Sequence, residues 1–168
     1  TPGTMVCSRE ATGITLAVNA GGVAAASYNI TNINSNGLTA SAGSPAPGSL
    51  LPASSISDDA WINITSANVN VVYTVVPVSA AGCEGNPADI TIVVKPEPVI
   101  TPDQTTGACS GNALDFEIQL DNFTNPGAGV TFTWNAPVLN PVNAAFTGGT
   151  ARSSASSANI TDTFINTL

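Results

Sequence analysis

The clearest pattern of apolar and polar positions lies between residues 114 and 121. Apolar residues alternate there with polar ones, in the order Leu114, Asp115, Phe116, Glu117, Ile118, Gln119, Leu120 and Asp121. A period of two predicts a β-strand with one buried and one solvated face. Ile14, Leu16 and Val18 share one face in the same way, and they predict an earlier strand of the same kind.

Two further segments predict strands. Residues 71–76 are apolar on both faces, which is typical of a strand in the middle of its sheet. Residues 90–94 form a second run of β-branched side chains. Gly, Pro, Asn and Ser interrupt the chain at short intervals, and no segment has the 3.6-residue period of a helix. The sequence therefore predicts an all-β fold, a sandwich with Greek-key connections.

The chain repeats itself. The triplet Val6-Cys7-Ser8 recurs as Ala108-Cys109-Ser110, which sets a period of 102 residues (109 minus 7). Three more segments recur in the same order: residues 27–30 as 132–135, 56–58 as 160–162, and 61–63 as 164–166. We therefore expect two copies of one module, so that the fold is a tandem of immunoglobulin-like sandwiches, the second incomplete.

The repeat predicts the domain boundaries. Residues 1–95 form a complete sandwich, and residues 96–103, in which prolines alternate with other residues, form a semi-rigid linker. Residues 104–168 form the front part of a second sandwich, because no counterpart of strands 71–76 and 90–94 precedes Leu168. We expect that the natural chain continues, or that a neighbour donates the missing strands.

Composition excludes several functions. Lys and Arg number 3 against 11 acidic residues, so the net charge is -8, and only 8% of residues are charged. Nucleic acid is excluded as a partner, because phosphate binding depends on clustered Lys and Arg. The apolar runs are far shorter than the ~20 residues that cross a bilayer, so we expect no membrane insertion.

The order of several motifs resembles a known family. These motifs are Cys7-Ser8, the aromatic strand around Tyr28, Tyr73-Thr74-Val75 before Pro77, Gly82-Cys83-Glu84-Gly85, Ile90-Thr91-Ile92-Val93-Val94 and Lys95-Pro96-Glu97-Pro98. Together they resemble the PKD-like repeat, which occurs in tandem in large surface proteins of bacteria that use type IX secretion, including gliding adhesins. The first copy carries Arg9 and Tyr28 where the second carries Gly111 and Trp134.

The resemblance implies a non-catalytic spacer or adhesive repeat at the bacterial cell surface. The partners that it implies are neighbouring repeats of the same chain, the secretion or anchoring machinery, and surface glycans. In that secreted setting we expect Cys7 and Cys83 to form a disulfide. Such a bridge closes a loop of 76 residues (83 minus 7) and stabilises by about 4 kcal/mol. The alternative is a pair of reduced thiols.

The third cysteine has no expected partner within the chain. By the period, the partner of Cys109 would lie near position 185 (83 plus 102), so we expect Cys109 to be unpaired.

Few residues could carry chemistry. The chain has no His, which excludes Ser-His-Asp and Cys-His nucleophile systems, so we expect no enzyme. Asp58 and Asp59 are candidate calcium ligands, and an Asx turn is the simpler interpretation. The acidic row at Asp115, Glu117 and Asp121 is interpreted as a solvated strand edge, since a glycosidase needs two acids facing each other across a cleft.

Glycan attachment and glycan binding are the remaining alternatives. Asn-x-Thr sequons begin at Asn29, Asn63, Asn122 and Asn159. Exposed aromatic residues could bind sugars, but we expect core positions for Tyr28, Trp61, Tyr73 and Trp134, which all lie in strand patterns. The sequence thus predicts a structural or adhesive repeat, and the alternative is a β-sandwich module that binds calcium or glycans.

Overall fold

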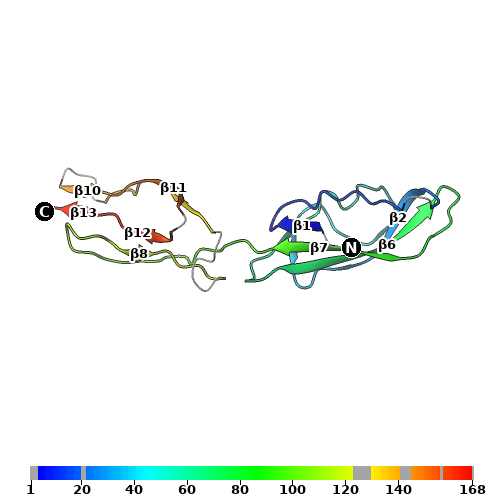
Figure 1. Cartoon of the computed structure of the whole chain (residues 1–168), viewed down its shortest axis with the longest axis horizontal. Helices are drawn as coiled ribbons and strands as arrows, with labels where there is room; N and C mark the ends of the chain where they lie inside the picture. The colour runs from blue at the N-terminus through cyan, green and yellow to red at the C-terminus, as the bar shows by residue number, and fades with distance from the viewer. Residues whose placement is uncertain (1–3, 20–21, 123–129, 141–144, 156, 168) are drawn as a thin grey trace. The chain divides into compact units, whose positions relative to one another are not determined.

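The computed structural model of the chain describes residues 4–19, 22–122, 130–140, 145–155 and 157–167. These residues form strands and loops, in two compact units that comprise Thr1–Glu97 (unit 1) and Pro98–Leu168 (unit 2) (Figure 1). The described residues include no helix that is long and apolar enough to cross a membrane. The predicted all-β fold is confirmed.

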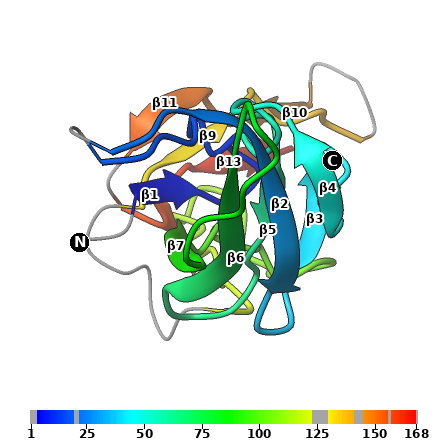
Figure 2. The ribbon, with the colours of Figure 1, turned by 90° about the vertical axis from the view of Figure 1, so that its right-hand side faces the viewer.

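Unit 1 is a two-layered β-sandwich. Its strands are β1 (Thr4–Cys7), β2 (Ala25–Asn34), β3 (Thr39–Ala42), β4 (Gly48–Leu51), β5 (Ala60–Ile62), β6 (Val69–Ser79) and β7 (Ala88–Lys95). One layer is a five-stranded sheet in the order β1-β7-β6-β2-β4, seen in Figure 2. The opposite layer contains the β3–β5 pair and the loops beside it. All pairs are antiparallel except β1 with β7, which run parallel.

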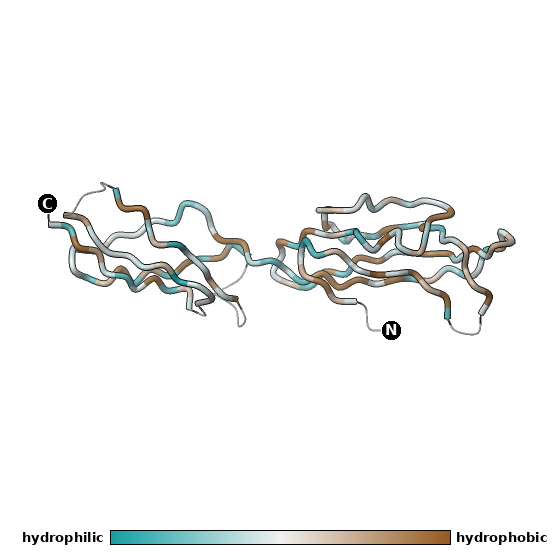
Figure 3. Tube along the Cα trace, turned by 90° about the horizontal axis from the view of Figure 1, so that it is seen from above, coloured by the Kyte–Doolittle hydropathy of each residue, from teal (hydrophilic) through white to brown (hydrophobic). Residues whose placement is uncertain are grey.

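Strand β6 is central in the five-stranded sheet, as its apolar run predicts. It pairs with β7 on one side and with β2 on the other. Val71, Tyr73 and Val75 are buried, while Val72 and Thr74 between them are half-buried. Figure 3 shows hydrophobic residues interspersed with hydrophilic ones along the strands. Because alternate residues of a strand point to opposite faces, the side chains of Val71, Tyr73 and Val75 enter the core.

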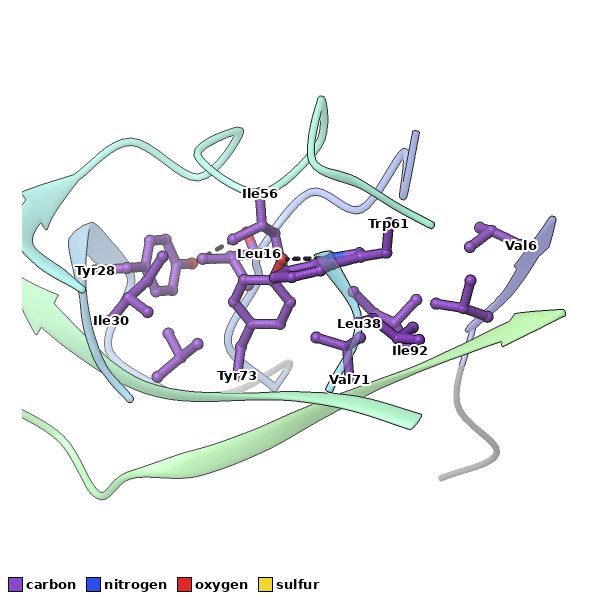
Figure 4. Close-up of a cluster of buried hydrophobic side chains, with 12 residues drawn as sticks. Val6, Leu16, Tyr28, Ile30, Leu38, Ile56, Trp61, Val71, Tyr73 and Ile92 are labelled. Carbon is purple, nitrogen blue, oxygen red and sulfur yellow. Dashed lines mark hydrogen bonds between the residues drawn. The ribbon is translucent and has the colours of Figure 1, made fainter. Parts of the chain in front are cut away.

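The core of unit 1 lies between the two layers. Its buried members are Val6, Leu16, Tyr28, Ile30, Leu38, Ile56, Trp61, Val71, Tyr73, Val75, Ile92 and Val94 (Figure 4). The rings of Trp61 and Tyr73 meet edge to face, with centroids 6.4 Å apart and planes inclined by 70°. This geometry is favoured by the ring quadrupoles and adds to the stabilisation from burial. The core positions predicted for Tyr28, Trp61 and Tyr73 are confirmed.

The strand predicted around residues 14–18 is absent from the ladders of the described sheets. Leu16 is buried with Ile14 and Val18 half-buried, so the predicted face is correct. The segment is extended but makes only isolated bonds to the facing loop, such as Leu16 N–H to Ala53 O at 2.8 Å. A period of two reports which side chains are buried and does not report whether the backbone has a continuous partner.

Unit 2 contains short strands in two-stranded pairs. They are β8 (Phe116–Glu117), β9 (Phe132–Trp134), β10 (Phe146–Gly148), β11 (Arg152–Ala155), β12 (Asn159–Ile160) and β13 (Phe164–Asn166). The pairs are β10 with β13, β11 with β9, and β12 with β8. The alternation between residues 114 and 121 is confirmed by burial, although only two of those residues are in a strand. Among the described residues of unit 2, Phe132 and Ala158 are the buried apolar ones.

The backbone hydrogen bonds of unit 1 recur in unit 2. Three N–H donors of unit 1 have counterparts 102 residues later in unit 2: Arg9 to Trp61 O and Gly111 to Phe164 O, Thr12 to Asp59 O and Leu114 to Asp162 O, Leu16 to Ala53 O and Ile118 to Ala158 O. One side chain recurs as well, because Ser8 Oγ accepts from Asn63 N–H and Ser110 Oγ accepts from Asn166 N–H, both at 2.9 Å. Equivalent bonds at four places indicate equivalent local folds.

Strand pairing recurs too, with the same irregularity. In unit 1, Tyr28 is opposite Leu51 and Ile30 is opposite Gly48. In unit 2, Phe132 is opposite Ala155 and Trp134 is opposite Arg152. Between the paired positions, one residue on the first strand faces two on the other in both cases, which is the geometry of a β-bulge. The four residues of one unit correspond to those of the other at a constant offset of 104 (132 minus 28). Tyr28 therefore corresponds to Phe132 and Ile30 to Trp134, so the match of Tyr28 with Trp134 that the sequence suggested is wrong.

The proline-rich stretch predicted as a linker, residues 96–103, is divided between the units. Glu97 N–H bonds to Asn63 O at 2.9 Å in unit 1, and Arg9 pairs with the Glu97 carboxylate at 2.8 Å. On the other side, Thr101 N–H bonds to Gln119 O at 3.0 Å in unit 2. The boundary between the units therefore lies between Glu97 and Pro98.

Candidate functional site

The most distinctive polar cluster of unit 1 is a buried chain of three side chains. Trp61 Nε1–H donates to Tyr73 Oη at 3.1 Å, and the Tyr73 hydroxyl donates to Asp59 Oδ2 at 2.8 Å. Asp59 is 2% exposed and Tyr73 is fully buried. We call these residues the Asp59 network. It joins β5 and β6 across the sandwich, so it positions the two layers relative to each other.

Burial sets the ionisation of this network. It raises the pKa of the Asp59 carboxyl, while the hydrogen bond from Tyr73 acts in the opposite direction. Burial also raises the pKa of the Tyr73 hydroxyl, with the neighbouring Asp59 adding to the effect. The network is enclosed and its donors are satisfied internally, so its geometry suits a structural role.

The raised pKa of Asp59 predicts a pH dependence of stability. The folded state holds the Asp59 proton more tightly than the unfolded state, so the free energy of unfolding falls as pH rises from the ordinary pKa through the raised one. We expect Asp59→Asn, which keeps the shape, to remove this part of the slope. Urea unfolding of both proteins from about pH 3.5 to 7 measures it. Parallel pH profiles would contradict the assignment.

The predicted calcium ligands do not form a site in the structure. Asp58 is exposed, whereas Asp59 is buried and engaged by Tyr73. In the part of the chain that the structure describes, no group of three His, Cys, Asp or Glu side chains could hold a metal ion. Asp58 and Asp59 are adjacent in the sequence, but the side chain of Asp58 is exposed to solvent and that of Asp59 is buried.

The predicted Cys7–Cys83 disulfide is wrong for this structure, in which both cysteines are free and exposed. Cys7 lies opposite Lys95 at one end of the sheet, whereas Cys83 lies in the loop that joins β6 to β7 at the other end. The seven steps along β7 from Ala88 to Lys95 alone span about 23 Å. A disulfide needs Cα atoms within about 7 Å of each other. Cys109 is also free and exposed.

Removing the cysteines tests this correction. We expect the double variant Cys7→Ser and Cys83→Ser to unfold at the same temperature as the parent chain, to within about 1 °C. A native bridge of this loop length would instead have contributed about 4 kcal/mol. Thermal unfolding without reductant measures the difference, and thiol titration of the parent chain, expected to find all 3 cysteines reactive, gives an independent count.

The acidic row of unit 2 is exposed, as predicted. Asp115 and Glu117 are exposed side chains, and Asp121 accepts a hydrogen bond from Thr101 Oγ1 at 2.7 Å. None of these groups faces another acid across a described cavity. The row therefore does not have the arrangement that glycoside hydrolysis requires.

One sequon is structural. Asn63 is fully buried, and its side-chain amide donates to Ala67 O at 2.9 Å and to Val94 O at 2.8 Å. An acceptor of a glycan must be exposed, so Asn63 is not one. The sequence contained a signal for this role, since Asn63 recurs as Asn166 in the repeat. Trp134 is half-buried and donates to Thr150 O at 3.1 Å, so its predicted core position is only partly reached.

The described residues of unit 2 form a groove and a smaller cavity. The groove has a volume of about 490 Å³, and it is lined by Ile100, Thr101, Pro102, Asp103, Gln104, Phe116, Ile118, Thr131, Phe132, Thr133 and Trp134. A cavity of about 260 Å³ lies beside Asp162 and is lined by Leu114, Trp134, Asn135, Pro137, Ile160, Asp162 and Phe164. We call these the β9 groove and the Asp162 cavity. The sequence pattern predicted neither of them, because each is lined by residues that lie far apart in the chain.

Comparison with known proteins identifies the family. Neither the curated proteins nor the solved structures gave a match. The family described as PKD-like domain matches residues 4–98, which is more than half of the chain. The matched region contains every strand from β1 to β7 and both ends of the Asp59 network. The chain therefore belongs to the PKD-like domain family.

Proposed function

We propose that this chain is a non-catalytic structural or adhesive segment made of tandem PKD-like modules. The observation that carries the proposal is the recurrence of four hydrogen bonds and one β-bulge in unit 2, about 102 to 105 residues after their counterparts in unit 1. A second copy of the module explains this recurrence, whereas an unrelated domain would share neither the bonds nor their order.

The family supports the structural role. PKD-like domains are typically non-catalytic structural modules, and they commonly occur in extracellular proteins. The low content of charged residues, 8% of the chain, and the internally hydrogen-bonded Asp59 network suit a module whose task is to hold its shape. We infer that the modules form part of a stalk or adhesive fibre at the bacterial cell surface, exported by type IX secretion and used in adhesion or gliding. Neighbouring modules, anchoring proteins and surface glycans are its expected partners.

Independent folding of unit 1 tests the modular proposal. We expect residues 1–98 alone to unfold cooperatively, with a midpoint within about 5 °C of the corresponding transition in the whole chain. A fragment that is unfolded, or one with a much lower midpoint, would contradict a self-sufficient module.

Ligand titration separates a structural module from a binding module. A ligand that binds the folded state raises the unfolding temperature by mass action. We expect no shift of the unfolding midpoint in millimolar calcium relative to EDTA, and no glycan retained on an array. A calcium-dependent rise or a specific glycan signal would favour the binding alternative instead.

A further inference from the structure

The turn after β1 carries an arginine at a position that favours glycine. Cys7 O accepts a hydrogen bond from Glu10 N–H at 3.1 Å, and Arg9, the third residue of this four-residue turn, has a φ of 66°. Turns with a positive φ at the third residue favour glycine there, because a Cβ atom disfavours the left-handed region. The backbone conformation of Arg9 is therefore unfavourable for its residue type.

The corresponding turn of unit 2 is built with glycine. Cys109 O accepts a hydrogen bond from Asn112 N–H at 3.0 Å, and Gly111, the third residue, has a φ of 82°. The same backbone bond to the facing strand also forms, from Arg9 N–H to β5 at 2.8 Å in unit 1 and from Gly111 N–H to β13 at 2.9 Å in unit 2. The turn forms without an arginine side chain in unit 2, so the side chain of Arg9 has a separate role in unit 1.

The Arg9 side chain grips the carboxylate of Glu97 with two hydrogen bonds. Arg9 Nε donates to Glu97 Oε2 at 2.8 Å, and Arg9 Nη2 donates to Glu97 Oε1 at 3.0 Å. A two-pronged pair of this kind is more directional than a single charged contact. The side chains are 58% and 23% exposed, so the carboxylate is the better shielded of the two. A further hydrogen bond joins the Ser8 side chain to the same carboxylate.

Glu97 also holds its own backbone to unit 1. Pro96 has no N–H, so Glu97 supplies the only backbone donor of the two residues that follow β7, which we call the exit segment. The Glu97 N–H donates to Asn63 O at 2.9 Å, directly after β5. Asn63 is fully buried, and its side-chain amide donates to a carbonyl of β7 at 2.8 Å. The main chain and the side chain of Glu97 thus fasten the exit segment at two points.

We propose that Arg9, Ser8 and Asn63 form a charge-controlled latch that holds the exit segment on unit 1 through Glu97. When this Arg9 latch is closed, the chain leaves unit 1 after Glu97. When it is open, the two residues of the exit segment join the connection between the units and lengthen it by about 7 Å. Opening leaves the sandwich intact, because β1, β5 and β7 pair without these residues. The latch goes beyond the proposed structural role and does not depend on what the modules bind.

Charge controls the latch because its two-pronged bond joins opposite charges near the surface. Arg9 is the charged side chain that acts on Glu97, and its hydrogen bonds lower the pKa of the Glu97 carboxyl. Of the other ionisable groups nearby, Glu10 bonds to Cys7 N–H and Lys95 is exposed. A carboxyl whose pKa is lowered by a contact stabilises that contact above its ordinary pKa, and the contribution is lost as pH falls through the lowered value. We therefore expect acid to open the latch, and 1 M salt to weaken it by screening.

Hydrogen exchange of the Glu97 amide in the whole chain tests the latch, because the bond to Asn63 O protects this N–H only while the latch is closed. We expect Arg9→Gly to lower the protection factor of this amide about fivefold. The unfolding temperature of unit 1 should stay the same or rise, because glycine suits the positive φ. The Leu16 amide, which bonds to Ala53 O, should lose no protection.

Two further variants and a salt series isolate the charge effect. Lys95→Gln is the matched control, since it removes an exposed cation two residues before Glu97, and we expect no change in Glu97 protection. Glu97→Gln removes the charge and keeps the shape, so Arg9→Gly should have little further effect in that background. Sodium chloride at 1 M should lower Glu97 protection in the parent chain but not in Arg9→Gly.

The carboxyl ¹³C signal of Glu97 gives a second readout. We expect its pKa to lie below the ordinary value in the parent chain and to return to that value in Arg9→Gly. Unchanged protection of the Glu97 amide in Arg9→Gly would overturn the latch. A fall in the unfolding temperature of unit 1 that accounts for the lost protection would also overturn it, because Arg9 would then support the sandwich itself.

Discussion

Replacing Tyr73 by alanine is expected to lower the free energy of unfolding of unit 1 by about 4 kcal/mol. The ring is fully buried, and its removal leaves a cavity between β6 and the opposite layer. It also removes the donor to Asp59 and the acceptor for Trp61 Nε1–H. Unpaired buried polar groups add to the loss from the cavity itself.

Two hydroxyl deletions separate the hydrogen bonds from the packing. Tyr73→Phe keeps the ring, and we expect a loss of about 2 kcal/mol because a buried carboxylate loses its donor. Tyr28→Phe is the matched control, since the Tyr28 hydroxyl donates to a neutral acceptor, Leu16 O, at 3.2 Å, and we expect about 1 kcal/mol. Urea unfolding followed by Trp61 fluorescence measures the loss of stability in all three variants, Tyr73→Ala, Tyr73→Phe and Tyr28→Phe. Equal losses for the two phenylalanine variants would contradict the role of the Asp59 network.

Replacing Gly43 by alanine is the second large change, with an expected loss of about 3 kcal/mol. Gly43 has a φ of 71°, in the left-handed region that side chains disfavour. A Cβ atom there would also lie 2.8 Å from Asp59 Cα, so the backbone that carries the Asp59 network would have to move. The backbone strain at positive φ and the steric overlap with Asp59 therefore both contribute to the loss of stability in Gly43→Ala.

Gly13→Ala is the matched control for this substitution. Gly13 has a similar φ of 64°, but a Cβ atom there would meet nothing within 4 Å. We expect its variant to lose only about 1 kcal/mol, the cost of the left-handed backbone alone. Thermal unfolding of both variants gives the comparison. If they are equally destabilised, close approach to Asp59 contributes nothing at Gly43.

Sequence patterns predicted which residues of a strand are buried better than they predicted which distant residues come together. Burial follows the alternation in residues 114–121 and the central position of β6 follows its two apolar faces, because both depend on short-range periodicity. The Cys7–Cys83 pairing failed for a different reason. It depends on which ends of the sheet the two residues reach, and that follows from the parallel course of β1 along β7, which no local pattern reports.

The Asp59 network was also beyond sequence reasoning. Asp58 and Asp59 are chemically identical neighbours, and only the fold decides that the second one faces Tyr73. The recurrence of an aspartate at Asp162 marked the position as part of the repeat. Its role became visible only when the two units, one with the tyrosine and one without it, could be compared bond by bond.

The parallel pairing of β1 with β7 has a mechanical consequence. The chain enters unit 1 on β1 and leaves it on the neighbouring strand, with Thr4 opposite Ile92 and Cys7 opposite Lys95. Tension between the two ends would pull these strands past each other along their length, so the bonds of the pair would be strained together and not opened one after another. A module threaded in this way is suited to transmit a pull without lengthening.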